Sequence, residues 1–183
     1  MSEYVYVDNS NVFIEGKQVS AVEKGYALNI WEAIENRVLD NEYRLDFSKL
    51  HTFTAGSDPT KIKRAVLFGS RPPINDAIWA SAERVGFETI IEDRNVSNRE
   101  KKIDTAITVA MTRDAYKQMN FAEDRITLVA GDADYVPAIQ CLREDGCTVD
   151  VFFWGHASKE LRQACSTFVS LDPYLHDLGS SAT

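Results

Sequence analysis

The sequence predicts an α/β protein whose central sheet is mainly parallel and is covered by helices on both faces. Short apolar runs recur along the chain, and most of them are separated by longer segments with the spacing of an amphipathic helix. The apolar runs are nearly continuous rather than alternating, which is typical of strands buried on both faces. Parallel neighbours also need a crossover between them, usually a helix. A chain of 183 residues with 44% apolar residues fits one such domain.

Six segments are expected to be strands, and four helices are expected between them. The strands lie at residues 4–7, 65–68, 89–91, 126–130, 148–153 and, with a weaker pattern, 168–171. The helices are predicted because apolar residues recur on one helical face. The four apolar stripes consist of Leu28, Trp31, Ile34 and Val38; of Ile74, Ile78, Ala82 and Val85; of Ile103, Ile107, Ala110 and Met111; and of Val136, Ile139 and Leu142. Gly86 and Gly146 are placed to end the second and fourth helices.

One segment interrupts this alternation. Residues 43–62 are expected to contain at most one short helix, and we interpret them as a surface connection rather than as a lid over a site. At the other end of the chain, the small and polar residues 179–183 predict a flexible tail. The sequence therefore predicts a single domain over residues 1–178 followed by this tail.

The charge balance limits the classes of function. Twenty Lys and Arg residues stand against 28 Asp and Glu residues, which gives a formal charge of -8. Such a protein does not adhere broadly to nucleic acid or to anionic membranes, so an RNA substrate would need a local basic patch or bridging metal ions. No apolar stretch reaches the roughly 18 to 20 residues that cross a bilayer. We therefore expect no membrane association.

The first residues and the cysteines indicate a cytoplasmic protein. Residues 1–3 lead directly into a strand-like run, without the basic and apolar regions of a secretory signal. Cys141, Cys147 and Cys165 form an odd set without a C-x-x-C pair, as expected for reduced, partly buried thiols with structural roles. The sequence leaves open whether the protein forms a homo-oligomer.

Carboxylates follow two of the predicted strands. Asp8 comes directly after the first, with Asn11 three residues later, and Asp132 and Asp134 come after the fourth. Asp104 lies early in the third predicted helix. Because ligands of parallel sheets collect at the carboxyl ends of the strands, we expect these acids to converge there. Two like charges about 4 Å apart repel by about 4 kcal/mol at an effective dielectric constant near 20, and a cation would relieve this repulsion.

The donor chemistry predicts the type of cation. The four carboxylates are hard oxygen ligands, and no His or Cys accompanies them in these motifs. This set favours Mg²⁺ or Mn²⁺ over Zn²⁺. A partly hydrated divalent ion leaves coordination positions for phosphate oxygens and water, so its natural chemistry is hydrolysis of a phosphodiester.

The same acids also allow interpretations other than a metal site. Asp8 and Asp134 could each cap a helix, and Asp104 gains about 0.3 to 1 kcal/mol from the helix macrodipole without any catalytic role. The G-x-x-x-x-G-K-[ST] and G-x-G-x-x-G motifs are absent, which argues against nucleotide triphosphatases and dehydrogenases. A phosphatase with Asp8 as nucleophile is disfavoured because Ser10 replaces its usual second acid.

Several segments together carry a resemblance to a known family. They are V-Y-V-D-N-S-N-V at residues 5–12, K-K-I-D at 101–104 and a G-D-x-D-Y-x-P pattern within 128–137. A looser match combines F-W-G at 153–155 with Ser158-x-x-Leu161 and residues 168–172. In their order and spacing these segments resemble the NYN domains, which belong to the PIN-like metal-dependent ribonucleases. The resemblance runs from residue 4 to about residue 172.

The resemblance implies a three-layer α/β/α fold of PIN-like type, with an acidic pocket that binds Mg²⁺ or Mn²⁺ and cuts RNA. The residues that match the acids of the family are Asp8, Asp104, Asp132 and Asp134. Asn11 matches its early amide. Ser158 matches a hydroxyl position near the pocket, where it would contact substrate.

The leading hypothesis is therefore a metal-dependent endoribonuclease. Asp8 and Asp132 would hold the ion most directly, with Asp104 and Asp134 completing the site directly or through water, and Asn11 would orient a ligand or the scissile phosphate. The basic residues that precede Asp104 are the candidates for binding RNA phosphates: Arg94, Arg99, Lys101 and Lys102. Whether RNA is preferred to DNA is left open.

Two non-enzymatic alternatives are retained. The same fold could serve as an RNA-binding or adaptor module in which the acids hold a structural ion or cap helices. A protein-interaction subunit would use exposed aromatic residues such as Trp79 or Trp154, although we expect both in the core or at its rim. His156 is expected to be a solvent-exposed loop residue and is assigned no role.

Overall fold

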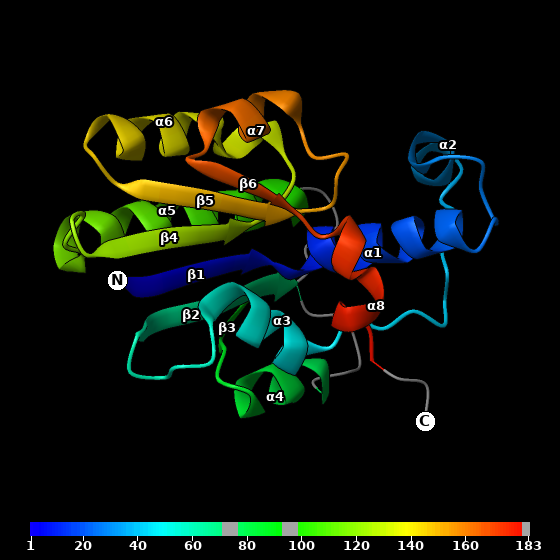
Figure 1. Cartoon of the computed structure of the whole chain (residues 1–183), viewed down its shortest axis with the longest axis horizontal. Helices are drawn as coiled ribbons and strands as arrows, with labels where there is room; N and C mark the ends of the chain where they lie inside the picture. The colour runs from blue at the N-terminus through cyan, green and yellow to red at the C-terminus, as the bar shows by residue number, and fades with distance from the viewer. Residues whose placement is uncertain (71–76, 93–98, 181–183) are drawn as a thin grey trace.

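The centre of the protein is a six-stranded sheet. The computed structural model describes residues 1–70, 77–92 and 99–180, with the backbone alone at 99–101. The strands are β1 (Ser2–Asp8), β2 (Ile62–Ser70), β3 (Glu88–Glu92), β4 (Asp124–Val129), β5 (Thr148–Phe153) and β6 (Thr167–Ser170). All pair in parallel, in the order β3-β2-β1-β4-β5-β6 (Figure 1). The predicted α/β class and the six strand positions are confirmed.

Helices cover both faces of the sheet. On one face lie α5 (Arg99–Gln118), α6 (Val136–Glu144) and α7 (Lys159–Ala164), and the other carries α1 (Asn9–Glu23), α3 (Phe47–Ala55), α4 (Ala77–Arg84) and α8 (Leu175–Leu178). Figure 1 shows α6 and α7 on the opposite side of the sheet from α3 and α4. Along β1, Tyr4 and Tyr6 face the first layer, and Val5 and Val7 face the second. The result is the expected three-layer α/β/α domain.

The first crossover helix differs from the prediction. The stripe at residues 28–38 was expected to form it, but α1 occupies residues 9–23 and the stripe holds only the short α2 (Ile30–Glu35). Leu28 and Trp31 are 88% and 65% exposed, so that stripe is not a core face. The buried side of α1 carries small and polar residues such as Gly16 and Gln18, which hide the helical hydrophobic period. Gly16 is required there because a Cβ would lie 2.7 Å from Cζ2 of Trp154.

The excursion at residues 43–62 contains one helix, as predicted, but it is not a plain surface connection. Asp46 caps α3 by accepting hydrogen bonds from the N–H groups of Ser48 and Lys49. Leu50 on this helix is fully buried in the core cluster of the second face. The excursion therefore supplies part of the helical layer that covers the sheet.

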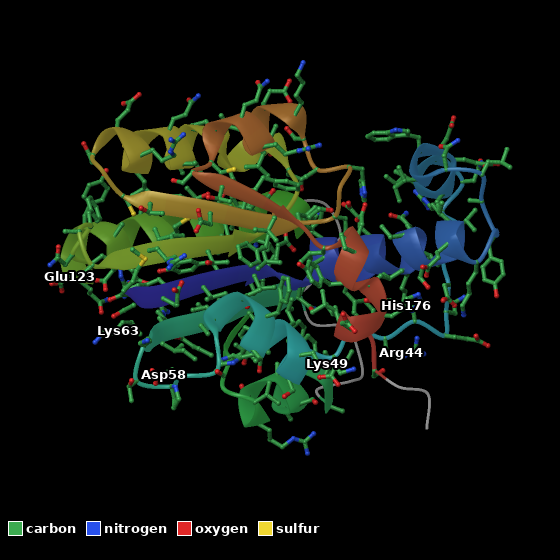
Figure 2. All side chains as sticks on the ribbon, viewed as in Figure 1. Arg44, Lys49, Asp58, Lys63, Glu123 and His176 are labelled. Carbon is green, nitrogen blue, oxygen red and sulfur yellow. The ribbon has the colours of Figure 1, made fainter. Side chains whose placement is uncertain are left out.

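At the C-terminal end, residues expected to be a free tail are partly held. The N–H of Ser180 donates to the carbonyl of Arg44, and Nζ of Lys49 donates to the carbonyl of Gly179. Figure 2 labels Arg44 and Lys49 beside this end of the chain. Residues 181–183 lie outside the described part of the chain.

A buried polar cluster fixes α5 on the sheet. Asp114 is fully buried, and it accepts a hydrogen bond from the hydroxyl of Tyr6 at 2.7 Å and one from Gln118 at 3.1 Å. Arg64 on β2 forms an ion pair with the same carboxylate. Because Asp104 lies on this helix, the cluster also determines where Asp104 is held relative to β1.

None of the helices in the described residues is both long enough and apolar enough to cross a membrane. Trp79 and Trp154 are 4% and 0% exposed, so neither offers a surface to a partner, and the interaction subunit built on them is ruled out. Cys147 and Cys165 are buried, whereas Cys141 is exposed.

Candidate active site

The candidate site lies where the strand order reverses. The chain winds outward from β1 in one direction to β2 and β3, and in the other to β4, β5 and β6. Between the carboxyl ends of β1 and β4 the two following connections diverge, which leaves a crevice where open α/β sheets bind their ligands. Asp8 is the last residue of β1, and Asp132 follows β4. This topology explains why acids far apart in the sequence face one cavity.

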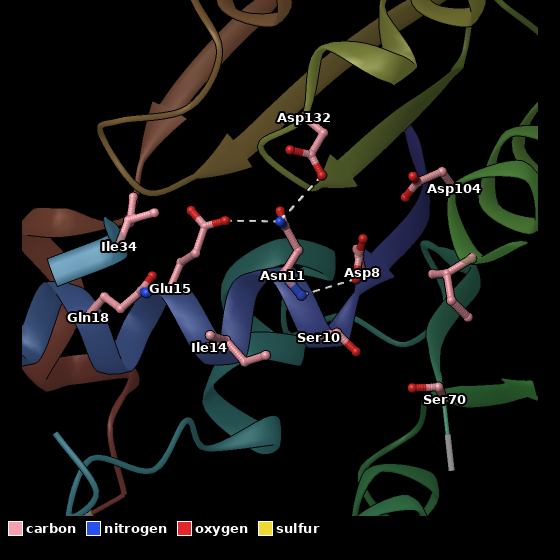
Figure 3. A pocket seen from close by; sticks show the side chains of 11 residues that line it. Asp8, Ser10, Asn11, Ile14, Glu15, Gln18, Ile34, Ser70, Asp104 and Asp132 are labelled. Carbon is pink, nitrogen blue, oxygen red and sulfur yellow. Dashed lines mark hydrogen bonds between the residues drawn. The ribbon is translucent and has the colours of Figure 1, made fainter. Parts of the chain in front are cut away.

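The cavity at this crevice has a volume of about 490 Å³ and runs along α1 (Figure 3). Its walls come from α1, α2, α5 and the ends of β1, β2 and β4. The lining residues are Asp8, Ser10, Asn11, Ile14, Glu15, Gln18, Ile34, Ser70, Ile103, Asp104 and Asp132. Three of the four predicted acids are among them. The fourth, Asp134, is exposed in the 3₁₀ turn η1 (Ala133–Tyr135) and does not line the cavity.

Asp8 and Asp104 are linked by a tyrosine that the sequence analysis did not single out. Tyr135 is fully buried, and its hydroxyl donates to Oδ1 of Asp104 at 2.9 Å. The same hydroxyl lies 3.4 Å from Oδ2 of Asp8. Its only sequence signal is its position directly after the second acid of the G-D-x-D-Y pattern. The role of Tyr135 in the motif is therefore to hold the carboxylates of Asp8 and Asp104 next to each other through its hydroxyl.

Asn11 joins the first and fourth strand ends. Its Oδ1 accepts the N–H of Gly131 at 2.9 Å, and its Nδ2 donates to Glu15 at 3.0 Å and to Asp132 at 3.4 Å. Asp8 also caps α1 by accepting the N–H of Asn11 at 3.1 Å. Asp8 therefore both caps α1 and lines the cavity.

Glu15 connects the cavity to a histidine that was expected to be exposed. The imidazole Nε2 of His156 is 2.5 Å from Oε2 of Glu15, and only 9% of the His156 side chain is exposed. The expectation that His156 is a solvent-exposed loop residue is wrong, because the β5–α7 connection folds back over α1. Glu15 was missed as well, although it lies one helical turn after Asn11 and on the same face.

Burial and mutual repulsion make it unfavourable for Asp8, Asp104 and Asp132 all to be ionised at once. Burial, and after it the charges of Asp104 and Asp132, raise the pKa of Asp8 to about 7, although the hydrogen bond from the Asn11 N–H acts in the opposite direction. Burial and the neighbouring carboxylates of Asp8 and Asp104 also raise the pKa of Tyr135 above its usual value. Tyr135 therefore keeps its proton and acts as a hydrogen-bond donor. A positive charge in the cavity would favour ionised Asp8.

Comparison with known proteins fixes the family. The sequence model of the NYN domain matches residues 4–172, which is nearly the whole chain. The chain belongs to the NYN domain family. This family is part of the PIN-like superfamily, so the chain has a PIN-like nuclease fold. No curated protein matches the sequence significantly.

A solved structure supports the fold of this NYN domain. It is a crystal structure of a protein of unknown function from Vibrio parahaemolyticus RIMD 2210633, with a TM-score of 0.68 and 17% sequence identity. The match covers 98% of this chain and 96% of that chain. At this level of identity the similarity concerns the fold alone.

The donor set of the NYN domain fits a hydrated divalent ion better than a preformed protein cage. Asp8, Asp104 and Asp132 supply hard oxygen ligands around one cavity, and burial, followed by the charges of the other two acids, raises the pKa of Asp8. In the described residues, however, no three acidic, His or Cys side chains are close enough to form a metal-binding group. Mg²⁺ usually keeps several waters and is held by one or two carboxylates together with substrate phosphates.

The predicted substrate-binding residues are only partly placed. Ser158 caps α7: its Oγ accepts the N–H of Leu161 at 3.2 Å and donates to Glu160 at 2.9 Å. It does not line the cavity, although its own N–H donates to the carbonyl of Gly131. Lys102 is exposed on α5.

Three other basic residues of the predicted cluster cannot be placed in the same way. Arg94 lies outside the described residues. Arg99 and Lys101 belong to α5, but their side chains lie outside the described part.

Proposed function

We propose that this NYN domain is a metal-dependent endoribonuclease that hydrolyses RNA phosphodiester bonds with Mg²⁺ or Mn²⁺. The observation that carries the proposal is the position of Asp8, Asp104 and Asp132 around one cavity at the point where the strand order reverses. The family supports it, because NYN domains act on RNA and are typically nucleases. The net charge of -8 also fits, since a cation would have to bridge this surface to a phosphate.

In this mechanism the three acids would hold the ion, which when bound polarises a phosphoryl oxygen and lowers the pKa of an attacking water. Tyr135 fixes Asp104 by donating to Oδ1 and stands beside Asp8. Asn11 donates to Asp132 and so sets the direction of that carboxylate. The protein thus contributes orientation and negative charge at fixed positions.

We assign more distant roles to the remaining predicted residues. Asp134 would act through water from outside the cavity wall, because it does not line the cavity, whereas Asp132, although also exposed, does. The basic residues Arg94, Arg99, Lys101 and Lys102 would attract the RNA backbone near the start of α5. Ser158 would act through the α7 cap rather than by contact with substrate.

The test compares two aspartates of the same motif, Asp132→Asn and Asp134→Asn. Cleavage of single-stranded and structured RNA is measured with Mg²⁺ or Mn²⁺, and metal binding is measured by calorimetry. We expect Asp132→Asn to reduce cleavage by at least about 100-fold and to weaken metal binding, with the fold retained. Asp134→Asn should have a smaller effect. Cleavage by Asp132→Asn at the wild-type rate, or undiminished cleavage in EDTA, would exclude the mechanism.

One observation favours a second candidate, a non-catalytic RNA-binding module. In the described residues the acids do not form a ready metal-binding group of three. Such a module would bind RNA without cutting it under any of the metal conditions, and Asp132→Asn would leave its RNA affinity unchanged. The same cleavage assay, combined with a binding measurement, separates the two candidates.

A further inference from the structure

The cavity does not end at the acids but continues along α1 into a different chemical environment. Asn11, Glu15 and Gln18 lie at successive turns on one face of this helix, and Ile14 lies beside them. The seven helical steps from Asn11 to Gln18 span about 10 Å. Figure 3 shows the carboxylates of Asp8, Asp104 and Asp132 at one end, and Gln18 with Ile34 at the other. One end is acidic, and the other is apolar with a single amide.

That amide has unused hydrogen-bonding capacity. Gln18 is only 6% exposed, and among the described residues its side chain has no protein hydrogen-bond partner. A second glutamine shows the contrast, because Nε2 of Gln118 donates to Asp114. The amide atoms of Gln18 are not among the fully buried polar atoms that lack a partner, so they still reach the solvent of the cavity. The Gln18 amide lines the cavity, so a ligand there can supply the missing bonds.

The walls next to Gln18 are apolar and exposed to solvent. Ile14 is 48% exposed, and Ile34 of α2 is a second apolar residue of the lining, at the same end as Gln18 (Figure 3). Trp31 precedes Ile34 by one helical turn and is 65% exposed. Trp31 does not line the cavity itself, but its ring meets the His156 ring edge to face at 6.1 Å, and His156 in turn pairs with Glu15, which does line it. Large apolar side chains left open beside a cavity indicate a flat, apolar ligand.

We propose that this end of the cavity binds an unpaired nucleobase next to the scissile phosphate. The Gln18 amide, which offers a donor and an acceptor, would pair with the polar edge of the base. Ile14 and Ile34 would pack on the faces of the base, and Trp31 would stack on a neighbouring base. The inference rests on the proposed function for the phosphate and deepens it by naming the residues that hold the base beside that phosphate. A base in a duplex is already paired and stacked, so it cannot enter.

The first experiment measures base binding without any cleavage. Labelled RNA pentamers, intact or with one abasic position, are titrated against the protein in EDTA at low salt, and fluorescence anisotropy reports binding. We expect the intact RNA to bind about 10-fold tighter than the best-placed abasic RNA. Gln18→Leu and Trp31→Ala should each remove most of this preference. Leu28→Ala is the matched control, because Leu28 is 88% exposed in the same segment and should leave the preference unchanged.

The second experiment compares cleavage of single-stranded and duplex RNA of the same sequence with Mn²⁺. The preference for single strands should fall in Trp31→Ala, which alters an exposed residue and should fold normally even if Gln18→Leu does not. Equal binding of intact and abasic RNA, or no binding of either at millimolar RNA, overturns the base site whatever the cleavage result. A base preference without any cleavage supports the base site and overturns the proposed nuclease function instead.

Discussion

Removing the hydroxyl of Tyr6 should destabilise the protein without touching the candidate site. In Tyr6→Phe, Asp114 loses a hydrogen bond of 2.7 Å between two fully buried groups, while the aromatic ring stays in place. Hydrogen bonds to charged groups contribute about 1.5 to 3 kcal/mol. Arg64 and Gln118 still bond to Asp114, so the carboxylate is not left alone and the lower half of this range applies.

The expected loss is therefore about 2 kcal/mol. For a domain of this size, 1 kcal/mol corresponds to a shift in melting temperature of about 2 to 4 °C, so Tyr6→Phe should melt about 4 to 8 °C lower. Thermal and urea unfolding followed by circular dichroism measure this. The chain offers a matched control in Tyr4, two residues earlier on the same face of β1. Among the described residues its hydroxyl has no hydrogen-bond partner.

Tyr4→Phe should change stability by less than about 0.5 kcal/mol. If Tyr6→Phe melts within 1 °C of the wild type, or if Tyr4→Phe loses as much stability, the buried cluster does not anchor α5 as argued. RNA cleavage at a temperature where both variants are folded should stay within about twofold of the wild type. The reason is that neither hydroxyl contacts the cavity, and that Arg64 on β2 still pairs with Asp114 and so keeps α5, with Asp104, in place.

Two further predictions concern the loops around the site and the stability in acid. Gly131→Ala should cost about 1 to 3 kcal/mol, because a Cβ would lie 2.2 Å from Cε1 of the buried Phe153. In urea unfolding, adding Phe153→Leu should recover part of this loss, whereas purely additive losses would contradict the steric argument. Burial raises the pKa of Asp40, but hydrogen bonds from Ser20, Lys24 and the Glu42 N–H outweigh it and hold the pKa at about 2. Because this value lies below the ordinary 3.8, the stabilisation is complete above about pH 4 and is lost as the pH falls toward 2. The stability advantage of the wild type over Asp40→Asn should shrink across this window, and an advantage independent of pH would refute the assignment.

Where the sequence analysis succeeded, the signal was local. The six apolar runs and the stripes of α4, α5 and α6 correspond to elements that their own periodicity predicts, although Ile74 of the α4 stripe lies outside the described residues. The first crossover helix lies at residues 9–23 and not at the predicted 28–38, and its period is hidden because the buried side of α1 carries Gly16 and Gln18 instead of large apolar residues. Gly16 is small because Trp154 packs against it, and Gln18 is polar because it lines the cavity. Both residue choices therefore depend on parts of the chain that are distant in sequence.

In the candidate site, too, some residues could be predicted from local sequence and others only from contacts with distant parts of the chain. That Asp8 ends one strand and Asp132 closely follows another is visible in the sequence, but Tyr135, Glu15 and His156 carry no pattern that marks them individually. Tyr135 matters because β1, α5 and η1 meet, and His156 matters because the β5–α7 connection reaches α1. The exposed position of Asp134 is likewise set by the turn that follows β4.

The sequence by itself determined the class of the fold, the parallel strands and the identity of the acids, because periodicity and strand-end chemistry act over a few neighbouring residues. Only the tertiary structure decided which acids share a cavity and what surrounds them. Those contacts join residues more than 100 positions apart, such as Asn11 and Asp132, and depend on β1 lying beside β4. Their energies come from packing and burial in the folded chain, which no local pattern records.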